Sequence, residues 1–445
     1  MKRARKERRK PANGRAVAGL SRRTLLTAAA GGAAALAAGV FSSAARTAGV
    51  RAAAPTTLQF WYVRYTIPLL NELLDGFGRA FEQSHPGVRV QVQAFPFGEY
   101  FQKVNVAYAG NQAPDVFFVD FPLIPNYVYR KMIVPLDGLV AKAELDDYYP
   151  APRNDMTYQG KVWALPMHQS GEQLLYNVDV LDQAKIRPPH TLDQEWTKED
   201  FLHVAEAVVR RDAGRVTRWA YATTYAPGLY VYQPWLAMSG GEVLSPDASR
   251  ATGYLNSPAT VNAFTFWGDL YTKRQLAPIQ PTPDLFGTGQ TAFTQGNPFV
   301  LRDIAARFSN LRVGATFMPR DRRCVTNSGA YHIGISVQAK QRDLAWEFVN
   351  SVAGRDGHLK WVKAAGYLPA LKSTYAELPY LKQYPWSVFW DGLAHCAVQR
   401  PRTPAYDFVD DTVTQASKDI QLGRPVKPIL DVAAAKIDQE LARYR

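Results

Sequence analysis

Residues 160–179 read GKVWALPMHQSGEQLLYNVD and contain two short apolar segments separated by a polar loop. Each segment, 161–165 and 173–177, is predicted to be a strand from its short run of apolar, β-branched and aromatic residues. Pro166 ends the first strand, because proline has no N–H to donate to a strand ladder. The loop at 167–171 is polar and holds a glycine that can adopt unusual dihedral angles. Two apolar strands that present such a loop form a candidate ligand site, although the stretch taken alone fits an ordinary surface hairpin better.

The formal net charge of +13 is concentrated at the start of the chain. Residues 1–51 hold 12 Lys and Arg against the single acidic residue Glu7, so they carry +11 and leave 40 basic against 38 acidic residues for the remainder. No block of like charge remains that could follow a phosphate backbone. The body of the chain is therefore not expected to bind nucleic acid.

The leader has a basic start, an apolar run from about residue 25 to 41 and small residues after it, which is the layout of a secretory signal. Residues 21–26, SRRTLL, resemble the twin-arginine export motif, with Leu25 where Phe is commoner. A nucleic-acid-binding or nuclear-localisation arm would not be followed by this apolar run. We expect export to the periplasm or the outer face of the cell membrane, with cleavage between 42 and 54. An uncleaved leader could also tether the protein, since its apolar run is near the lower limit for spanning a bilayer.

The chain has two cysteines, Cys324 and Cys396, and seven scattered histidines. Two thiols form neither a disulfide framework nor a metal cluster. A single disulfide is compatible with an oxidising compartment, and two free thiols are equally compatible with the sequence. No two histidines stand at metal-ligand spacing, so neither a metal nor another cofactor is expected.

The first part of the mature chain alternates between strand and helix patterns. Residues 57–63, 88–92 and 115–119 read as strands, with helices beginning at about residues 68 and 99. This order predicts an open α/β sheet with parallel strands. Ligands of such sheets bind beyond the carboxyl ends of the strands, which here carry Tyr62, Arg64, Asp120 and Phe121.

Four segments in order resemble one family, the extracellular solute-binding proteins (family 1) that serve ATP-binding-cassette importers and mostly carry sugars. Together they extend over nearly all of the mature chain. The segments are APDVF at 113–117 with PLD at 135–137, GKVWALP at 160–166 with YNVD at 176–179, FTQG at 293–296, and AWEFV at 345–349 with GYLP at 366–369.

The resemblance implies a periplasmic-binding-protein-like α/β fold, in which two α/β lobes are joined by hinge crossings with a ligand cleft between them. Carried onto this sequence, the crossings fall near Phe121, Val313 and Gly366. Residues 1–51 would be the twin-arginine-type export signal and linker. Lobe 1 would comprise 55–121 plus 313–366, and lobe 2 would comprise 122–312 plus 367–445.

Sugar recognition needs flat apolar rings for the C–H faces and hydrogen-bonding groups for the hydroxyls. We select side chains at predicted strand ends and turns, most of which the resemblance places near the cleft. The ligand-binding candidates are Tyr62, Arg64, Asp120, Phe121, Gln169, Ser170, Tyr225, Tyr230, Trp235, Phe299, Arg302, Asp303, Gly329, Ala330, Tyr331 and Tyr406.

Two of these candidate groups have a second interpretation. Many relatives place a Met and a Trp after the third motif, where this chain has Asn297, Pro298 and Phe299, so the aromatic platform is either Phe299 or another ring. Arg64 and Arg302 could clamp a carboxylate or phosphate, or could equally form surface ion pairs.

The sequence predicts an exported, monomeric substrate-binding protein that closes two lobes on a carbohydrate and delivers it to a membrane permease, without covalent chemistry. The alternatives are a binding protein for a charged small solute, such as a sugar acid, sugar phosphate or polyamine, and a secreted carbohydrate-active enzyme. No nucleophile elbow, HExxH motif or phosphate loop is present. Residues 287–292 match a dinucleotide fingerprint but follow no strand, so we predict a loop entering a helix within 284–294.

Overall fold

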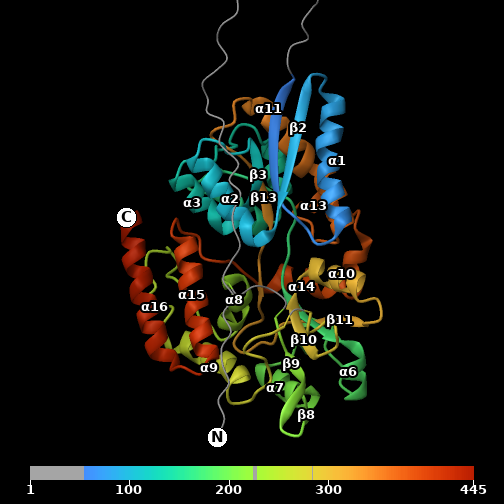
Figure 1. The fold of residues 1–445 in the computed structure, drawn as a ribbon, viewed down its shortest axis with the longest axis vertical. Helices are drawn as coiled ribbons and strands as arrows, with labels where there is room; N and C mark the ends of the chain where they lie inside the picture. Colours follow the sequence, from blue (N-terminus) through green and yellow to red (C-terminus); the bar gives the residue numbers. More distant parts are fainter. Residues whose placement is uncertain (1–54, 224–227, 283) are drawn as a thin grey trace, which may run out of the picture. The chain divides into compact units, whose positions relative to one another are not determined.

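The computed structural model describes residues 55–223, 228–282 and 284–445 (Figure 1). The export signal predicted at 1–51 and the candidate Tyr225 lie outside these residues. Two five-stranded mixed sheets organise the described chain. The first contains, in spatial order, β2 (Val88–Phe95), β1 (Thr56–Val63), β3 (Val116–Asp120), β13 (Tyr331–Ile335) and β6 (Leu165–Pro166). The second contains β11 (Val313–Thr316), β7 (Gln173–Asn177), β10 (Thr291–Gly296), β9 (Arg215–Tyr221) and β8 (Arg210–Asp212).

The first sheet confirms the predicted alternation of strands and helices. β1 pairs in parallel with both β2 and β3, whereas β13 runs antiparallel to β3 and to β6. Helix α1 (Pro68–Ser84) connects β1 to β2 and lies beside β2 (Figure 1), and α2 (Phe97–Ala109) connects β2 to β3. Proline at the first turn of α1 favours its start, and apolar residues three or four apart form its buried face.

The second sheet is built around β7, the strand predicted at 173–177. β7 is flanked by β10 and β11, both antiparallel to it, and β9 runs parallel to β10. The helix predicted within 284–294 is wrong, because residues 291–296 form β10, a fully buried strand between β7 and β9. The strand predicted at 161–165 is divided between two pairings: β5 (Lys161–Val162) pairs with β4 (Thr157–Tyr158), and β6 pairs with β13.

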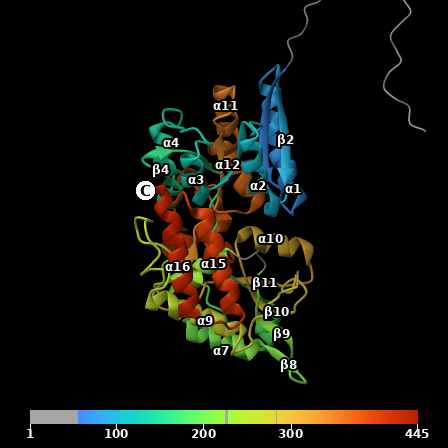
Figure 2. The ribbon, with the colours of Figure 1, turned by 60° about the vertical axis from the view of Figure 1, so that its left-hand side comes forward.

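Helices cover the sheets and complete the core. On the first sheet these are α1, α2, α11 (Arg342–Ala353) and α12 (Arg355–Ala365), with α3 (Ile124–Tyr129), α4 (Lys142–Asp147) and α5 (Pro150–Asp155) between β3 and β4. The second sheet is followed or covered by α6 (Val178–Gln183), α7 (Lys198–Val208), α8 (Leu229–Ala237), α9 (Pro258–Tyr271), α10 (Pro298–Arg307), α14 (Trp386–Cys396), α15 (Tyr406–Gln421) and α16 (Val426–Leu441). Figure 2 shows α15 and α16 side by side, as their packing requires.

The chain passes from one sheet to the other at different places from those expected. It leaves the first sheet between β6 and β7, at residues 167–172, and returns between β11 and β13, at 317–330. The crossings predicted near Phe121 and Val313 are therefore wrong, because β6 still pairs in the first sheet and β11 pairs in the second. A third passage, 366–385, joins α12 to α14 and begins at the predicted Gly366, whose φ of 72° ends α12. We call these three stretches the crossing segments.

A disulfide joins Cys324 to Cys396, which settles the pairing that the sequence left open. β12 (Thr326–Asn327) begins two residues after Cys324 and β14 (Ala397–Val398) directly after Cys396, and the two strands pair in parallel. In the described part of the chain, no helix combines the length and the apolar composition that a membrane crossing requires.

Candidate functional site

The crossing segments lie against one another and bury the polar loop from which the sequence analysis began. The backbone of Gln169 exchanges hydrogen bonds of 2.7 and 3.1 Å with Leu368, and that of Ser170 exchanges bonds of 2.8 and 3.0 Å with Gly329. His168, Gln169 and Ser170 are all buried. The interpretation as a surface hairpin is therefore wrong. The loop instead joins all three passages between the two sheets.

Gly329 also fixes the position of a ring from the second sheet's side. A Cβ atom added to Gly329 would stand 2.7 Å from the ring of Tyr230, so only glycine permits this close approach. The Tyr230 hydroxyl lies 3.3 Å from the Ser170 Oγ and accepts from the Asn297 amide at 3.3 Å. Tyr230 is thereby held against two crossing segments.

Arg400, which the sequence analysis did not select, lies at the centre of the predicted candidates. Its side chain is only 6% exposed and makes a bidentate ion pair with Asp120, with Nη–Oδ distances of 2.6 and 2.8 Å. Nη1 also donates to the Tyr406 hydroxyl at 3.2 Å. The guanidinium carbon lies 4.8 Å from the ring centre of Phe121 and 5.2 Å from that of Tyr230. We call these five residues the Arg400 cluster; it joins the end of β3 to the start of α15.

The surroundings of Arg400 keep its guanidinium charged. Burial opposes the charge on Arg400, but Asp120 and Tyr406 outweigh that effect and raise the pKa of Arg400 well above its usual value. Burial also raises the pKa of the Tyr230 and Tyr406 hydroxyls, so both remain neutral hydrogen-bonding groups. The cluster therefore offers neutral hydroxyls and aromatic rings around a cation that already has its counter-ion.

A second group of rings surrounds Phe299 at the start of α10. Its ring lies 5.5 Å from that of Tyr65, just after β1, and stacks on Tyr367 at 6.0 Å with 17° between the planes. His168 also stacks on Tyr367, with 3.7 Å between the ring centres. The His168 Nδ1 accepts a hydrogen bond from the Trp361 indole N–H at 3.1 Å. Burial lowers the pKa of His168 well below its usual value, so it is neutral. Phe299 is thus packed against rings from the loop after β1 and from the crossing segment 366–385, and its role as a platform ring stays a prediction.

Two carboxyl groups are buried behind the polar loop. Glu172 is 0% exposed; its Oε2 accepts from the side chains of Asn327, at 3.0 Å, and Gln295, whereas Oε1 has no partner among the described residues. Asp155 accepts from Gln399 at 2.7 Å, from Ser328 at 3.2 Å and from Gln169 at 3.3 Å. Burial raises the pKa of Glu172 to about 8 and that of Asp155 to about 7.

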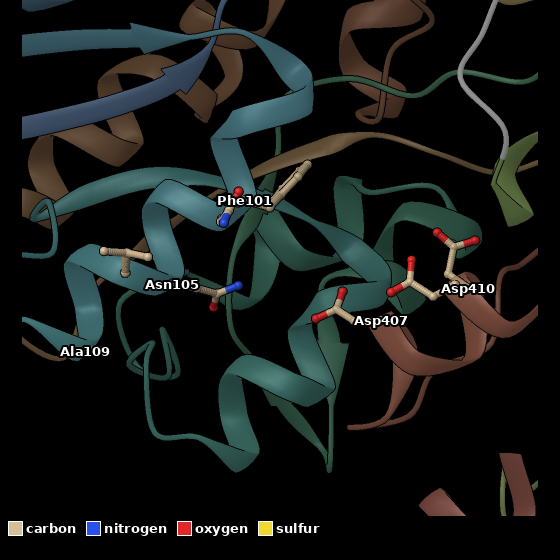
Figure 3. A pocket seen from close by; sticks show the side chains of 8 residues that line it. Phe101, Asn105, Ala109, Asp407 and Asp410 are labelled. Carbon is tan, nitrogen blue, oxygen red and sulfur yellow. The ribbon is translucent and has the colours of Figure 1, made fainter. Parts of the chain in front are cut away.

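A cavity of about 640 Å³ lies between α2 and α15 (Figure 3). Its polar lining consists of Gln102 and Asn105 on α2 with Asp407, Asp410 and Asp411 on α15, and Phe101 adds a ring. Asp410 accepts a hydrogen bond from the backbone N–H at the start of α8, and burial raises its pKa to about 6. Tyr406 of the Arg400 cluster immediately precedes this acidic turn, so the cavity and the cluster share the start of α15.

Several other candidates have structural partners. Asp303 accepts from Thr66 at 2.8 Å, which joins α10 to the loop after β1. Arg302 donates to the Ala364 carbonyl and Arg64 to that of Ala94, so both guanidinium groups are engaged by backbone oxygens. Ala330 is buried and Tyr331 is half-buried, with its ring stacked on Phe118.

Two predicted contacts lie inside the cores. Tyr62 is buried and its hydroxyl donates to Asp75 at 3.0 Å, while Trp235 is buried and its indole N–H donates to Gln295 at 2.9 Å. Neither ring has a face left for a solute, so we withdraw both as direct contacts. Across the described ranges, no three His, Cys, Asp or Glu side chains are grouped so that they could hold a metal ion.

Comparisons with known proteins place this geometry in a family. The profile of the family described as bacterial extracellular solute-binding protein matches residues 77–385. A binding protein of Brucella abortus is 22% identical over 387 residues, with 82% of this chain and 89% of that protein covered. The melibiose/raffinose/stachyose-binding protein MelE of Bacillus subtilis is 22% identical over 320 residues, with 68% and 72% covered.

A solved structure shows the same fold. The ABC substrate-binding protein of Listeria monocytogenes in complex with cycloalternan matches with a TM-score of 0.76 and 21% identity, covering 87% of this chain and 99% of that one. The fold is therefore the periplasmic-binding-protein-like α/β fold that the four sequence segments predicted. Since the family profile extends over well more than half of the sequence, the chain belongs to the bacterial extracellular solute-binding proteins.

Proposed function

We propose that this protein captures a neutral carbohydrate between two lobes and delivers it to the membrane permease of an ATP-binding-cassette importer. One observation carries the proposal: the Arg400 cluster brings segments of both sheets together, with the buried Phe121, Arg400 and Tyr406 supporting Asp120 and Tyr230, which keep exposed surface. Rings that contact sugar C–H faces, together with hydroxyl-binding groups, are what sugar recognition requires. Relatives and structural neighbours named for oligosaccharide binding point the same way.

The proposed lobes are built on the two sheets, with the crossing segments 167–172, 317–330 and 366–385 between them. A solute that contacts both lobes would favour the state in which they approach, which is a population shift toward a closed form. We propose that the chain acts as a monomer, is exported through its twin-arginine-type leader, and functions in the periplasm or at the outer face of the cell membrane. No covalent chemistry is proposed.

The charges favour a neutral solute over an anionic one. Arg400 already has Asp120 as its counter-ion, and Arg64 and Arg302 donate to backbone carbonyls. The cavity beside the cluster is lined by three aspartates of α15, which would repel a sugar acid or a sugar phosphate. The same aspartates favour a second candidate, a cationic solute such as an amino sugar or a polyamine.

A thermal-shift screen tests the proposal and separates these solute classes. The panel contains raffinose, stachyose and maltotriose as neutral sugars, glucuronate and glucose 6-phosphate as anions, and spermidine as a cation. A solute at 100 times its dissociation constant should stabilise the protein by about 2.7 kcal/mol. Stabilisation by a neutral sugar supports the proposal, and stabilisation by spermidine alone supports the second candidate. Release of smaller sugars during incubation would instead identify an enzyme.

A further inference from the structure

The disulfide lies where two segments that carry site residues meet. Cys324 belongs to the crossing segment 317–330, and Cys396 is the last residue of α14. The two strands that follow them, β12 and β14, contain two residues each and pair in parallel. The Ser328 N–H donates to the Val398 carbonyl at 2.8 Å and extends this pairing by one step.

The residues at the end of β12 fix the positions of Glu172 and Tyr230, on the second sheet's side of the proposed site. Asn327 accepts from the backbone N–H of Glu172 at 3.1 Å, and its amide donates to the Glu172 carboxylate and to the backbone carbonyl of Tyr230. Gly329, two residues further on, contacts the Tyr230 ring and bonds Ser170. The position of β12 therefore determines where the Tyr230 ring lies.

The residues after β14 bind Asp155 and Asp120, on the first sheet's side of the proposed site. Gln399 donates to Asp155 Oδ1 at 2.7 Å, and Arg400 makes the bidentate pair with Asp120. Ser328, on the β12 side, donates to Asp155 Oδ2 at 3.2 Å. The two segments that follow the cysteines, 325–331 and 397–405, are called the two arms. Both start at the disulfide and meet again on Asp155; the first contacts Tyr230 of α8, and the second contains Arg400.

Two paired residues are too few to keep such a ribbon in register by themselves, since even an isolated two-stranded hairpin is marginal in water. A covalent link beside the first pair removes most alternative arrangements of the two arms. We propose that the Cys324–Cys396 disulfide is a positioning element of the solute site. It holds β12 and β14 in register and thereby places Arg400 at Asp120 and Tyr230 beside it.

Hydrogen–deuterium exchange tests this placement without any solute. In the double variant Cys324→Ala/Cys396→Ala, peptides covering 325–331 and 397–405 should exchange about tenfold faster or more, corresponding to about 1.4 kcal/mol of lost local protection. Peptides covering β1, at 56–63, should be unchanged. Leu74→Ala is the matched control, because it removes a buried side chain of α1 and destabilises the first sheet's core without touching the disulfide. Unchanged exchange in the two arms, or a uniform rise throughout both sheets, would overturn the proposal.

The consequence for affinity rests on the proposed function. Under conditions where both proteins are fully folded, the double variant should bind raffinose or maltotriose about tenfold more weakly than the wild type. The same cysteine substitutions should have little further effect in an Arg400→Ala background, because the two perturbations act through one contact. Equal losses in both backgrounds would contradict positioning through Arg400. If neither sugar binds the wild type, the carbohydrate proposal fails, whereas the exchange experiment still decides the role of the disulfide.

Discussion

Replacing Glu172 by Gln should remove the part of the pH dependence of folding stability that this buried carboxyl causes. Burial raises the pKa of this carboxyl from 4.5 to about 8, so the folded protein keeps its proton where the unfolded chain has released it. At this carboxyl the folded state binds more protons than the unfolded state between pH 4.5 and about 8, so the contribution of Glu172 to stability falls as the pH rises through that window. At about 1.4 kcal/mol per pKa unit, the loss is at most about 5 kcal/mol.

Glutamine is a suitable replacement because its amide oxygen can still accept from Asn327 and Gln295, yet it cannot ionise. Urea unfolding, followed by tryptophan fluorescence from about pH 5 to about pH 8, should show a steeper loss of stability for the wild type than for Glu172→Gln. The exposed Glu72→Gln is the control and should keep the wild-type slope. If Glu172→Gln also keeps the wild-type slope, the reasoning from burial is refuted.

Three further substitutions test the site. Arg400→Met should lower the free energy of unfolding by about 3–5 kcal/mol, because it leaves Asp120 partly buried without its partner, and adding Asp120→Asn should recover part of that loss. Gly329→Ala should cost about 1–3 kcal/mol, since the new methyl group meets the Tyr230 ring; an unchanged urea midpoint would argue against that contact. Phe299→Ala should weaken raffinose binding about tenfold in calorimetry, whereas an unchanged affinity would remove Phe299 from the site.

The periodic parts of the sequence predicted the first sheet well. Alternation at 88–92 and apolar spacing after residue 68 are local signals, and β2 and α1 follow them. Residues 291–296 were predicted to be helical, because a short buried strand has no apolar–polar alternation to distinguish it from a helix. The crossings near Phe121 and Val313 were wrong for a related reason: the sheet that a strand joins depends on partners far away in sequence.

The same distinction between local and distant signals applies to the site. Asp120 and Phe121 could be selected because they follow a parallel strand. Arg400 could not, since it stands in the irregular sequence QRPRTP and its partner Asp120 lies 280 residues earlier. Glu172 and Asp155 look like ordinary surface carboxylates in the sequence, and only their burial distinguishes them.

The mutual bonding of the crossing segments has a consequence for redesign. Because Ser170 bonds Gly329 through its backbone and meets Tyr230 through its hydroxyl, the proposed hinge between the lobes and the floor of the proposed site share the same residues. Substitutions in this floor that admit a different solute would therefore also change the proposed opening and closing of the lobes. The side chains of α2 and α15 that line the neighbouring cavity lie outside the three crossing segments. Selectivity is therefore better engineered from these side chains, where recognition can change while the movement is preserved.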